Sequence, residues 1–89
     1  MRLRNRNLLV DRIEYAEISE REVARRAGLS HSTVNHLLTG RRHTCSLSTA
    51  LAIERVLDSA PGTLFAADSV DERSLLTDYA RSVRLTRRR

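Results

Sequence analysis

Apolar residues recur at helical spacing in separate stretches of this chain, and each stretch predicts one helix. Residues 2–17 predict a first helix, which is capped by Asn5 or Asn7. Its apolar positions are Leu9, Val10, Ile13 and Ala16. A later stretch, capped by Ser46, is apolar around more than one side and therefore predicts a helix in the middle of the fold. That helix carries Leu47, Ala50, Leu51, Ile53, Val56 and Leu57.

Residues 19–40 lie between these two stretches and predict two short helices joined by a tight turn. Ser19 can cap the first of them, and Glu22 has the spacing that completes a capping box. Gly28 stands where a helix ends with positive φ, and Ser30 can cap the second helix. The apolar sides consist of Val23, Ala24 and Ala27 in the first helix and Val34, Leu37 and Leu38 in the second. Neither helix can bury its apolar side alone, so the two must pack together.

Two further elements are predicted after the helix that Ser46 caps. Pro61 ends that helix, and residues 61–65 predict a single closing helical turn that plugs the core. Ser69 and Glu72 have the spacing of a second capping box, which begins an amphipathic helix. Its apolar stripe consists of Leu75, Leu76, Tyr79, Ala80 and Val83. The stripe can dock on its own domain, pair with a second copy or receive another protein.

The charge of the chain favours a polyanionic partner. The formal net charge is +5, and all sixteen basic residues are arginine. Arginine suits both phosphate groups and guanine edges, although GC-rich codon usage also explains the absence of lysine. Two tyrosines and one phenylalanine are too few to build base-stacking surfaces for single strands. Duplex nucleic acid is therefore the expected partner.

Other classes of function find little support in the sequence. No paired acids, nucleophile elbow or phosphate-cradling glycine loop points to an enzyme. His43 and the single cysteine, Cys45, supply two candidate ligands where a structural zinc site needs four, so neither a metal nor a cofactor is expected. No apolar run approaches the ~20 residues of a membrane span. We therefore expect a binding protein of the bacterial cytoplasm, at the nucleoid.

The central stretch resembles the helix-turn-helix of the Cro and phage-repressor family, also called the XRE family. The residues that carry this resemblance are Ala24, Gly28, Val34, Leu37 and Gly40. It covers residues from about 8 to 66 and implies an all-α, compact five-helix lambda-repressor-like domain, with the motif at helices 2 and 3. The expected organisation is a DNA-binding domain over residues 1–66, followed by an amphipathic helix and basic tail over residues 67–89. A helical hairpin without any DNA role is the alternative interpretation.

The resemblance also places base-reading positions on the second helix of the motif, which enters the major groove. The candidates are Ser30, His31, Ser32, Thr33, Asn35 and His36. Asn35 can in principle pair bidentately with adenine. Ser30 is also a helix cap, which is its favoured role, and the two histidines are also compatible with an ordinary surface.

Phosphate contacts are expected from groups that flank this helix. They are Thr39, Arg41, Arg42, Thr44 and Ser46. Arg21 and Arg25 are weaker candidates, and the arginines at 2, 4 and 6 form either a phosphate-binding arm or a solvated end, as does the basic tail 86–89. One departure concerns Glu20, because the family often has glutamine there and a carboxylate repels phosphate.

These inferences together predict a sequence-specific double-stranded DNA-binding regulator of transcription. The expected protein is a phage or bacterial repressor, or a Cro-like protein, that acts by occluding a promoter. A single recognition helix reads few base pairs, so two copies on a palindromic operator are expected, with a homodimer through residues 70–85. The alternatives are an excisionase-like or architectural DNA-binding protein, and an antitoxin or adaptor whose last helix binds a protein partner.

Overall fold

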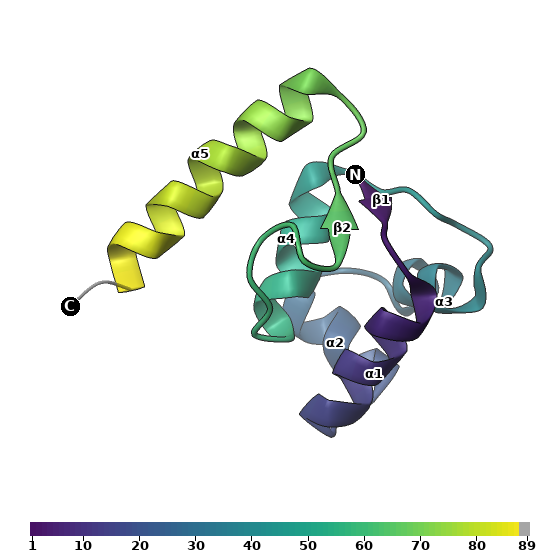
Figure 1. The fold of residues 1–89 in the computed structure, drawn as a ribbon. Coiled ribbons are helices and arrows are strands. Elements are labelled where there is room, and N and C mark those ends of the chain that lie inside the picture. The colour runs from purple at the N-terminus through teal and green to yellow at the C-terminus, as the bar shows by residue number, and fades with distance from the viewer. Residues whose placement is uncertain (88–89) are drawn as a thin grey trace.

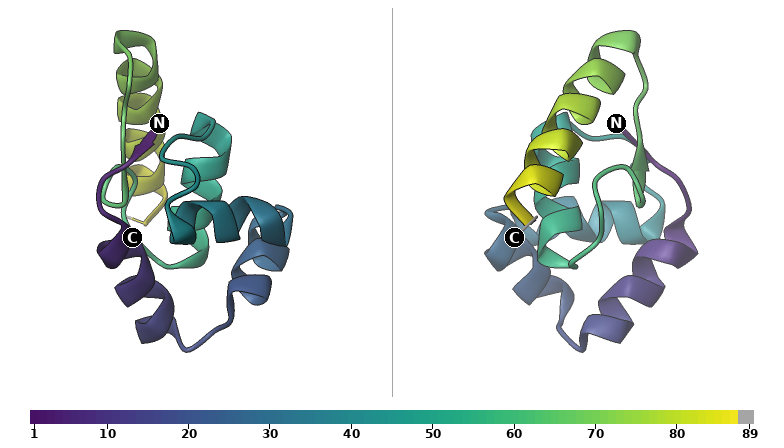
Figure 2. Two further views of the ribbon diagram at one scale, coloured as in Figure 1. Left: turned by 90° about the vertical axis from the view of Figure 1, so that its right-hand side faces the viewer. Right: turned by 60° about the vertical axis from the view of Figure 1, so that its left-hand side comes forward.

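The computed structural model describes the backbone of residues 1–87 and the side chains of residues 1–82. Within this part the chain forms five helices and one two-stranded sheet (Figures 1 and 2). The elements are β1 (Arg2–Leu3), α1 (Arg6–Ala16), α2 (Glu20–Ala27), α3 (His31–Thr39), α4 (Leu47–Val56), β2 (Phe65–Ala66) and α5 (Val70–Arg87). The predicted all-α class is confirmed, with α2 and α3 as the helix-turn-helix pair. The side chains of Val83 and of the predicted basic tail lie outside the described residues.

The predicted helix starts are confirmed by side-chain caps. Asn5, not Asn7, caps α1, and its side chain accepts a hydrogen bond from the Asn7 amide at 2.8 Å. The side-chain oxygens of three serines each accept a hydrogen bond from the backbone amide three residues further on, at 3.1 to 3.2 Å. These serines are Ser19, Ser30 and Ser46. These bonds satisfy amides that a helix start otherwise leaves unpaired. The first capping box also predicts that the Glu22 side chain bonds back to the Ser19 residue. That part of the prediction is wrong, because the Glu22 carboxylate binds Arg25 and Arg26 instead.

The helices close around one apolar core, to which each of α1 to α4 contributes. Val23 and Ala24 of α2 meet the buried Val34 and Leu37 of α3 in this core. A glycine with φ of 72° ends α2, so the chain turns into α3 without the strain that a side chain would meet there. The other buried members are Met1, Leu9, Ile13, Ala50, Ile53, Leu57, Leu64 and Phe65.

The predicted closing helical turn over residues 61–65 is wrong, because this segment leads into strand β2. The cause is the buried carboxylate of Glu54 on α4, which is 1% exposed. It accepts hydrogen bonds from the amides of Gly62 and Leu64 at 3.0 Å and of Phe65 at 3.2 Å. Amides held by one carboxylate are not available to a helical ladder, so no helix forms here. The chain instead makes one turn, in which the Thr63 amide donates to the Ala60 carbonyl at 3.1 Å, and it becomes extended at Phe65. The expected five-helix domain is therefore four helices and a strand pair, with α5 as the additional helix.

The amino-terminal residues form neither an arm nor a solvated end. β1 pairs antiparallel with β2, with Leu3 opposite Phe65. On its other side the Leu3 amide donates to the His43 carbonyl at 2.8 Å. Met1 and Leu3 face inward and Arg2 faces out, which is the alternation of a half-buried strand. This two-residue period overrides the helical interpretation of the first few residues.

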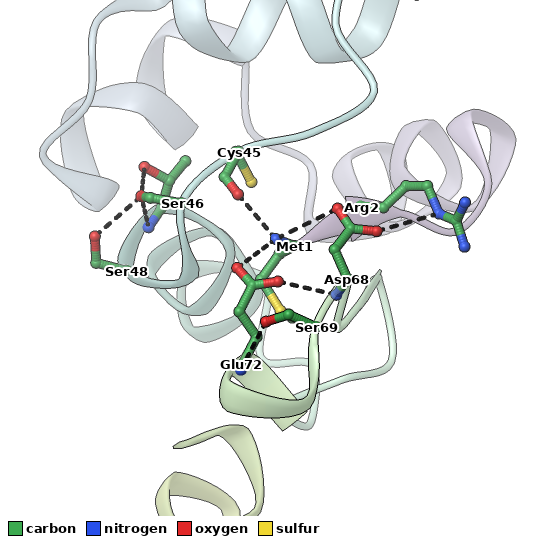
Figure 3. A network of polar contacts seen from close by, with 9 residues as sticks. Met1, Arg2, Cys45, Ser46, Ser48, Asp68, Ser69 and Glu72 are labelled. Carbon is green, nitrogen blue, oxygen red and sulfur yellow. Dashed lines mark hydrogen bonds and ion pairs between the residues drawn. The ribbon is translucent and has the colours of Figure 1, made fainter. Parts of the chain in front are cut away.

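Helix α5 runs along one side of the molecule, away from α3 (Figure 1). Leu76 is partly buried and packs against the core. It lies close to Gly62, because a Cβ at position 62 would be only 3.3 Å from the Leu76 Cδ2 atom. Glu72 holds the start of the helix in place. Its carboxylate accepts hydrogen bonds from the Met1 amine at 2.7 Å and from the Asp68 amide at 2.9 Å (Figure 3). These two hydrogen bonds, the amine first, lower the pKa of Glu72. No helix among the described residues is long and apolar enough to cross a bilayer.

Candidate nucleic-acid interface

The outer side of α3 carries the predicted base-reading residues. Val34 and Leu37 point into the core, which fixes the rotation of the helix. As a result His31 and Ser32, in its first turn, are exposed, while Asn35 and His36, one turn later, are half-buried. This arrangement presents polar side chains of neighbouring turns on the surface of one short helix.

Ser30 and Thr33 are hydrogen-bonded to each other at the start of α3. The Ser30 hydroxyl accepts the Thr33 amide at 3.2 Å and lies 2.8 Å from the Thr33 hydroxyl. The capping role of Ser30 is therefore present in the structure. Both hydroxyls can still accept or donate one further bond, because each carries two lone pairs and one proton.

Glu20, the first residue of α2, lies against the candidate residues of α3. Its Oε1 accepts a hydrogen bond from the Asn35 side-chain nitrogen at 3.2 Å. The same oxygen is 3.8 Å from His31 Nε2, which is too long for a hydrogen bond. Glu20 departs from the glutamine that is common at this position in the family it resembles, but no feature of the sequence indicates that Glu20 contacts Asn35.

Arginines gather at the carboxyl end of α3. Arg41 and Arg42 are exposed in the loop that follows this helix, and the Arg42 amide donates to the His36 carbonyl at 3.0 Å. Arg6, at the start of α1, reaches the same place and donates to the Thr39 carbonyl at 3.5 Å. Three arginines from two segments therefore lie at or beside one helix end, where phosphates can be bound by charge and by forked hydrogen bonds.

The other predicted phosphate contacts have local partners. Thr44 is exposed and forms a β-bridge with Arg2, so the amino-terminal strand holds this loop. The Ser46 hydroxyl caps α4 and also lies 3.1 Å from the Ser48 hydroxyl (Figure 3). Arg25 is bound to Glu22 on its own helix, whereas Arg4 donates to the Gly62 carbonyl at 2.8 Å, on the sheet side of the fold. Of the amino-terminal arginines, Arg4 thus lies on the sheet side of the fold, whereas Arg6 lies at the end of α3.

The described residues offer no metal-binding cluster, since no three His, Cys, Asp or Glu side chains converge among them. Burial raises the pKa of the Cys45 thiol to about 11, so this thiol is neutral at physiological pH. The polar chemistry of α3 and its surroundings is therefore that of hydrogen bonding and charge, which suits recognition of a nucleic acid.

Comparison with known families agrees with this geometry. A family model described as a helix-turn-helix domain matches residues 2–67, which is more than half of the chain. The chain belongs to this helix-turn-helix domain family. It is thus a DNA-binding helix-turn-helix protein, in which α2 and α3 form the motif. Comparisons with curated proteins and with solved structures found no match.

Proposed function

We propose that this helix-turn-helix protein is a sequence-specific regulator of transcription in the cytoplasm of a bacterial cell, a phage or bacterial repressor or a Cro-like protein. In this proposal α3 enters the major groove of an operator, and the bound protein occludes the promoter. The observation that carries the proposal is the surface of α3, where polar side chains face outward beside exposed arginines. Such a surface combines base reading with phosphate binding.

The individual contacts follow from the position of each residue. We assign base reading first to His31, Ser32 and His36, with Ser30, Thr33 and Asn35 as further members of the set. We assign phosphate binding to Arg41 and Arg42, which follow α3, with Arg6 beside them. The hydroxyls proposed to contact phosphates are those of Thr39, Thr44 and Ser46.

Selection of binding sites from random duplex DNA at near-physiological salt tests this function. The expected product is a palindrome whose half-sites lie about one helical turn apart, because two copies of α3 read equivalent sequences. Recovery of no shared motif would contradict a sequence-specific regulator. A matched control uses His36→Ala, which we expect to recover a motif with one relaxed base pair.

We propose that α5 joins two copies on this operator. Leu75 is 56% exposed and Tyr79, one turn later, is half-buried, so the helix presents an incompletely covered apolar strip within residues 70–85. Leu75→Glu is expected to abolish the simultaneous occupancy of two half-sites while single half-sites still bind. Val70→Glu is the matched control, since Val70 is 82% exposed but lies about 140° around the helix from Leu75.

The same exposed Leu75 also favours a second candidate function, an adaptor whose α5 holds a protein partner. Electrophoretic titration of a two-half-site duplex separates the two candidates. Loss of the doubly bound complex in Leu75→Glu supports pairing of two copies. Unchanged double occupancy in that variant would contradict the homodimer and favour the adaptor.

A further inference from the structure

Glu20 makes a contact between the two helices of the motif at the surface that we assign to DNA. The residue directly follows the Ser19 cap, so its position at the start of α2 is fixed. Its side chain is 41% exposed, and its Oε1 accepts a hydrogen bond from Asn35 Nδ2 at 3.2 Å. The contact joins residues 15 positions apart in the chain. It therefore ties one particular side chain of α3 to α2.

The chemistry of a carboxylate fixes which end of the Asn35 amide faces Glu20. An ionised carboxylate only accepts hydrogen bonds, so the amide nitrogen, and not the oxygen, must point toward it. One of the two Asn35 N–H groups is then occupied. The groups left to read DNA are one N–H donor and one carbonyl acceptor.

This remaining pair of groups matches one base. A free asparagine amide can give two donors, which suits the two acceptors N7 and O6 of guanine. With one donor held by Glu20, that mode is lost. One donor and one acceptor match adenine instead, which offers N7 as an acceptor and the N6 amino group as a donor.

We infer that Glu20 is a positioning residue that holds Asn35 for reading an adenine in the major groove. This inference rests on the proposed function. Glu20 does not touch the base in this account, and it acts through the orientation of Asn35. Its charge weakens the attraction of the surface for phosphates, so the carboxylate lowers affinity for all duplexes while it sharpens preference at one base pair.

The test compares three variants on the selected operator and on a set of duplexes that replace each base pair in turn. Asn35→Ala is expected to reduce preference for adenine at one position by about tenfold or more. Glu20→Ala is expected to reduce preference at that same position, while its binding to random duplex DNA tightens. Glu20→Gln keeps an acceptor oxygen without the charge, so it is expected to retain the preference and to tighten binding to all duplexes.

The double variant Glu20→Ala with Asn35→Ala distinguishes positioning from an independent contact. We expect it to show no further loss of preference beyond Asn35→Ala alone, because the two residues act as one unit. Far-UV circular dichroism and thermal melting of each variant establish that α2 and α3 remain folded. A merely structural role of Glu20 would change melting without changing preference at a single base pair.

Two outcomes would overturn the inference, and they are distinguishable. If the wild-type protein prefers a sequence and Glu20→Ala retains the full preference at the Asn35 position, Glu20 does not position Asn35, whereas the proposed function stands. If the wild-type protein prefers no sequence, the proposed function fails, and this inference fails with it.

Discussion

The helix-turn-helix pair, α2 and α3, and the amino-terminal sheet, β1 with β2, are stabilised in different ways. In the pair each helix starts at a serine cap that bonds an amide three residues away, and the turn is made by one glycine. In and beside the sheet the contacts join segments further apart in the chain, such as Leu3 with Phe65, and Glu54 of α4 with residues 62–65. Local signals thus determine the region assigned to DNA, and long-range contacts determine the region that supports it. We therefore expect the supporting region to be the more sensitive to single substitutions.

The largest effect is expected for Glu54→Ala, which breaks the supporting region. The substitution leaves two buried amides and one partly buried amide without their acceptor, so the free energy of unfolding should fall by roughly 3 kcal/mol or more. Urea denaturation measures this loss. Glu54→Gln is the control, because its amide oxygen still accepts part of these bonds and the loss should be smaller. Equal stability of Glu54→Ala and the wild type would contradict the role assigned to this carboxylate.

A smaller effect is expected for Ser30→Ala in the helix-turn-helix pair. The variant loses one cap, which should lower the free energy of unfolding by about 1 kcal/mol. Ser46→Ala is a matched control, because it removes the same kind of cap from α4. If Ser30 acts mainly as a cap, the variant keeps the sequence preference of the wild type in binding assays. Loss of preference at one base pair would instead identify Ser30 as a base reader.

The smallest effect is a difference in how the two regions respond to pH. Hydrogen bonds from Arg25 and Arg26 lower the pKa of Glu22 from 4.5 to about 2, so its contribution to stability is present above pH 4.5 and is lost as the pH falls toward 2. Burial raises the pKa of Glu54, against the opposing effect of its backbone hydrogen bonds. The contribution of Glu54 therefore has the opposite sign: it is present below pH 4.5 and is lost as the pH rises through the raised pKa.

Melting temperatures of the wild type, Glu22→Gln and Glu54→Gln across this pH range measure both contributions. We expect Glu22→Gln to flatten the loss of stability on the acid side, and Glu54→Gln to flatten the loss above pH 4.5. An unchanged decline above pH 4.5 in Glu54→Gln would show that another group causes it.

The same contrast explains how much could be predicted from the sequence. Serine caps and the turn glycine are local, so the bounds of α2 and α3 and the start of α4 follow from residues a few positions apart. Glu54 lies within an apolar helix, and nothing near it in the sequence indicates that it binds the 62–65 loop. The strand at Arg2–Leu3 is too short for its alternation to outweigh the helical pattern that follows.

The candidate site divides in the same way. The outward side of α3 was predictable, because buried Val34 and Leu37 fix the rotation of the helix. Its neighbours were not, because Glu20 and Arg6 reach α3 only through the packing of α2 and α1. The individual DNA contacts stay predictions until binding is measured.

Base reading by α3 and phosphate binding by the loop after it are tested together by comparing His36→Ala and Arg41→Ala in binding to the selected operator and to random duplex DNA, each over a range of salt concentrations. Arg73→Ala is the matched control for loss of an exposed arginine, because α5 lies away from α3 (Figure 1) and Arg73 is about 160° around that helix from Leu75. We expect His36→Ala to weaken binding to the operator alone. Arg41→Ala should weaken binding to every duplex and reduce the salt slope by about one unit, whereas Arg73→Ala should bind all duplexes as the wild type does. Equal effects of His36→Ala and Arg41→Ala on selected and random DNA would contradict the assignment of base reading to α3 and phosphate binding to the loop that follows it.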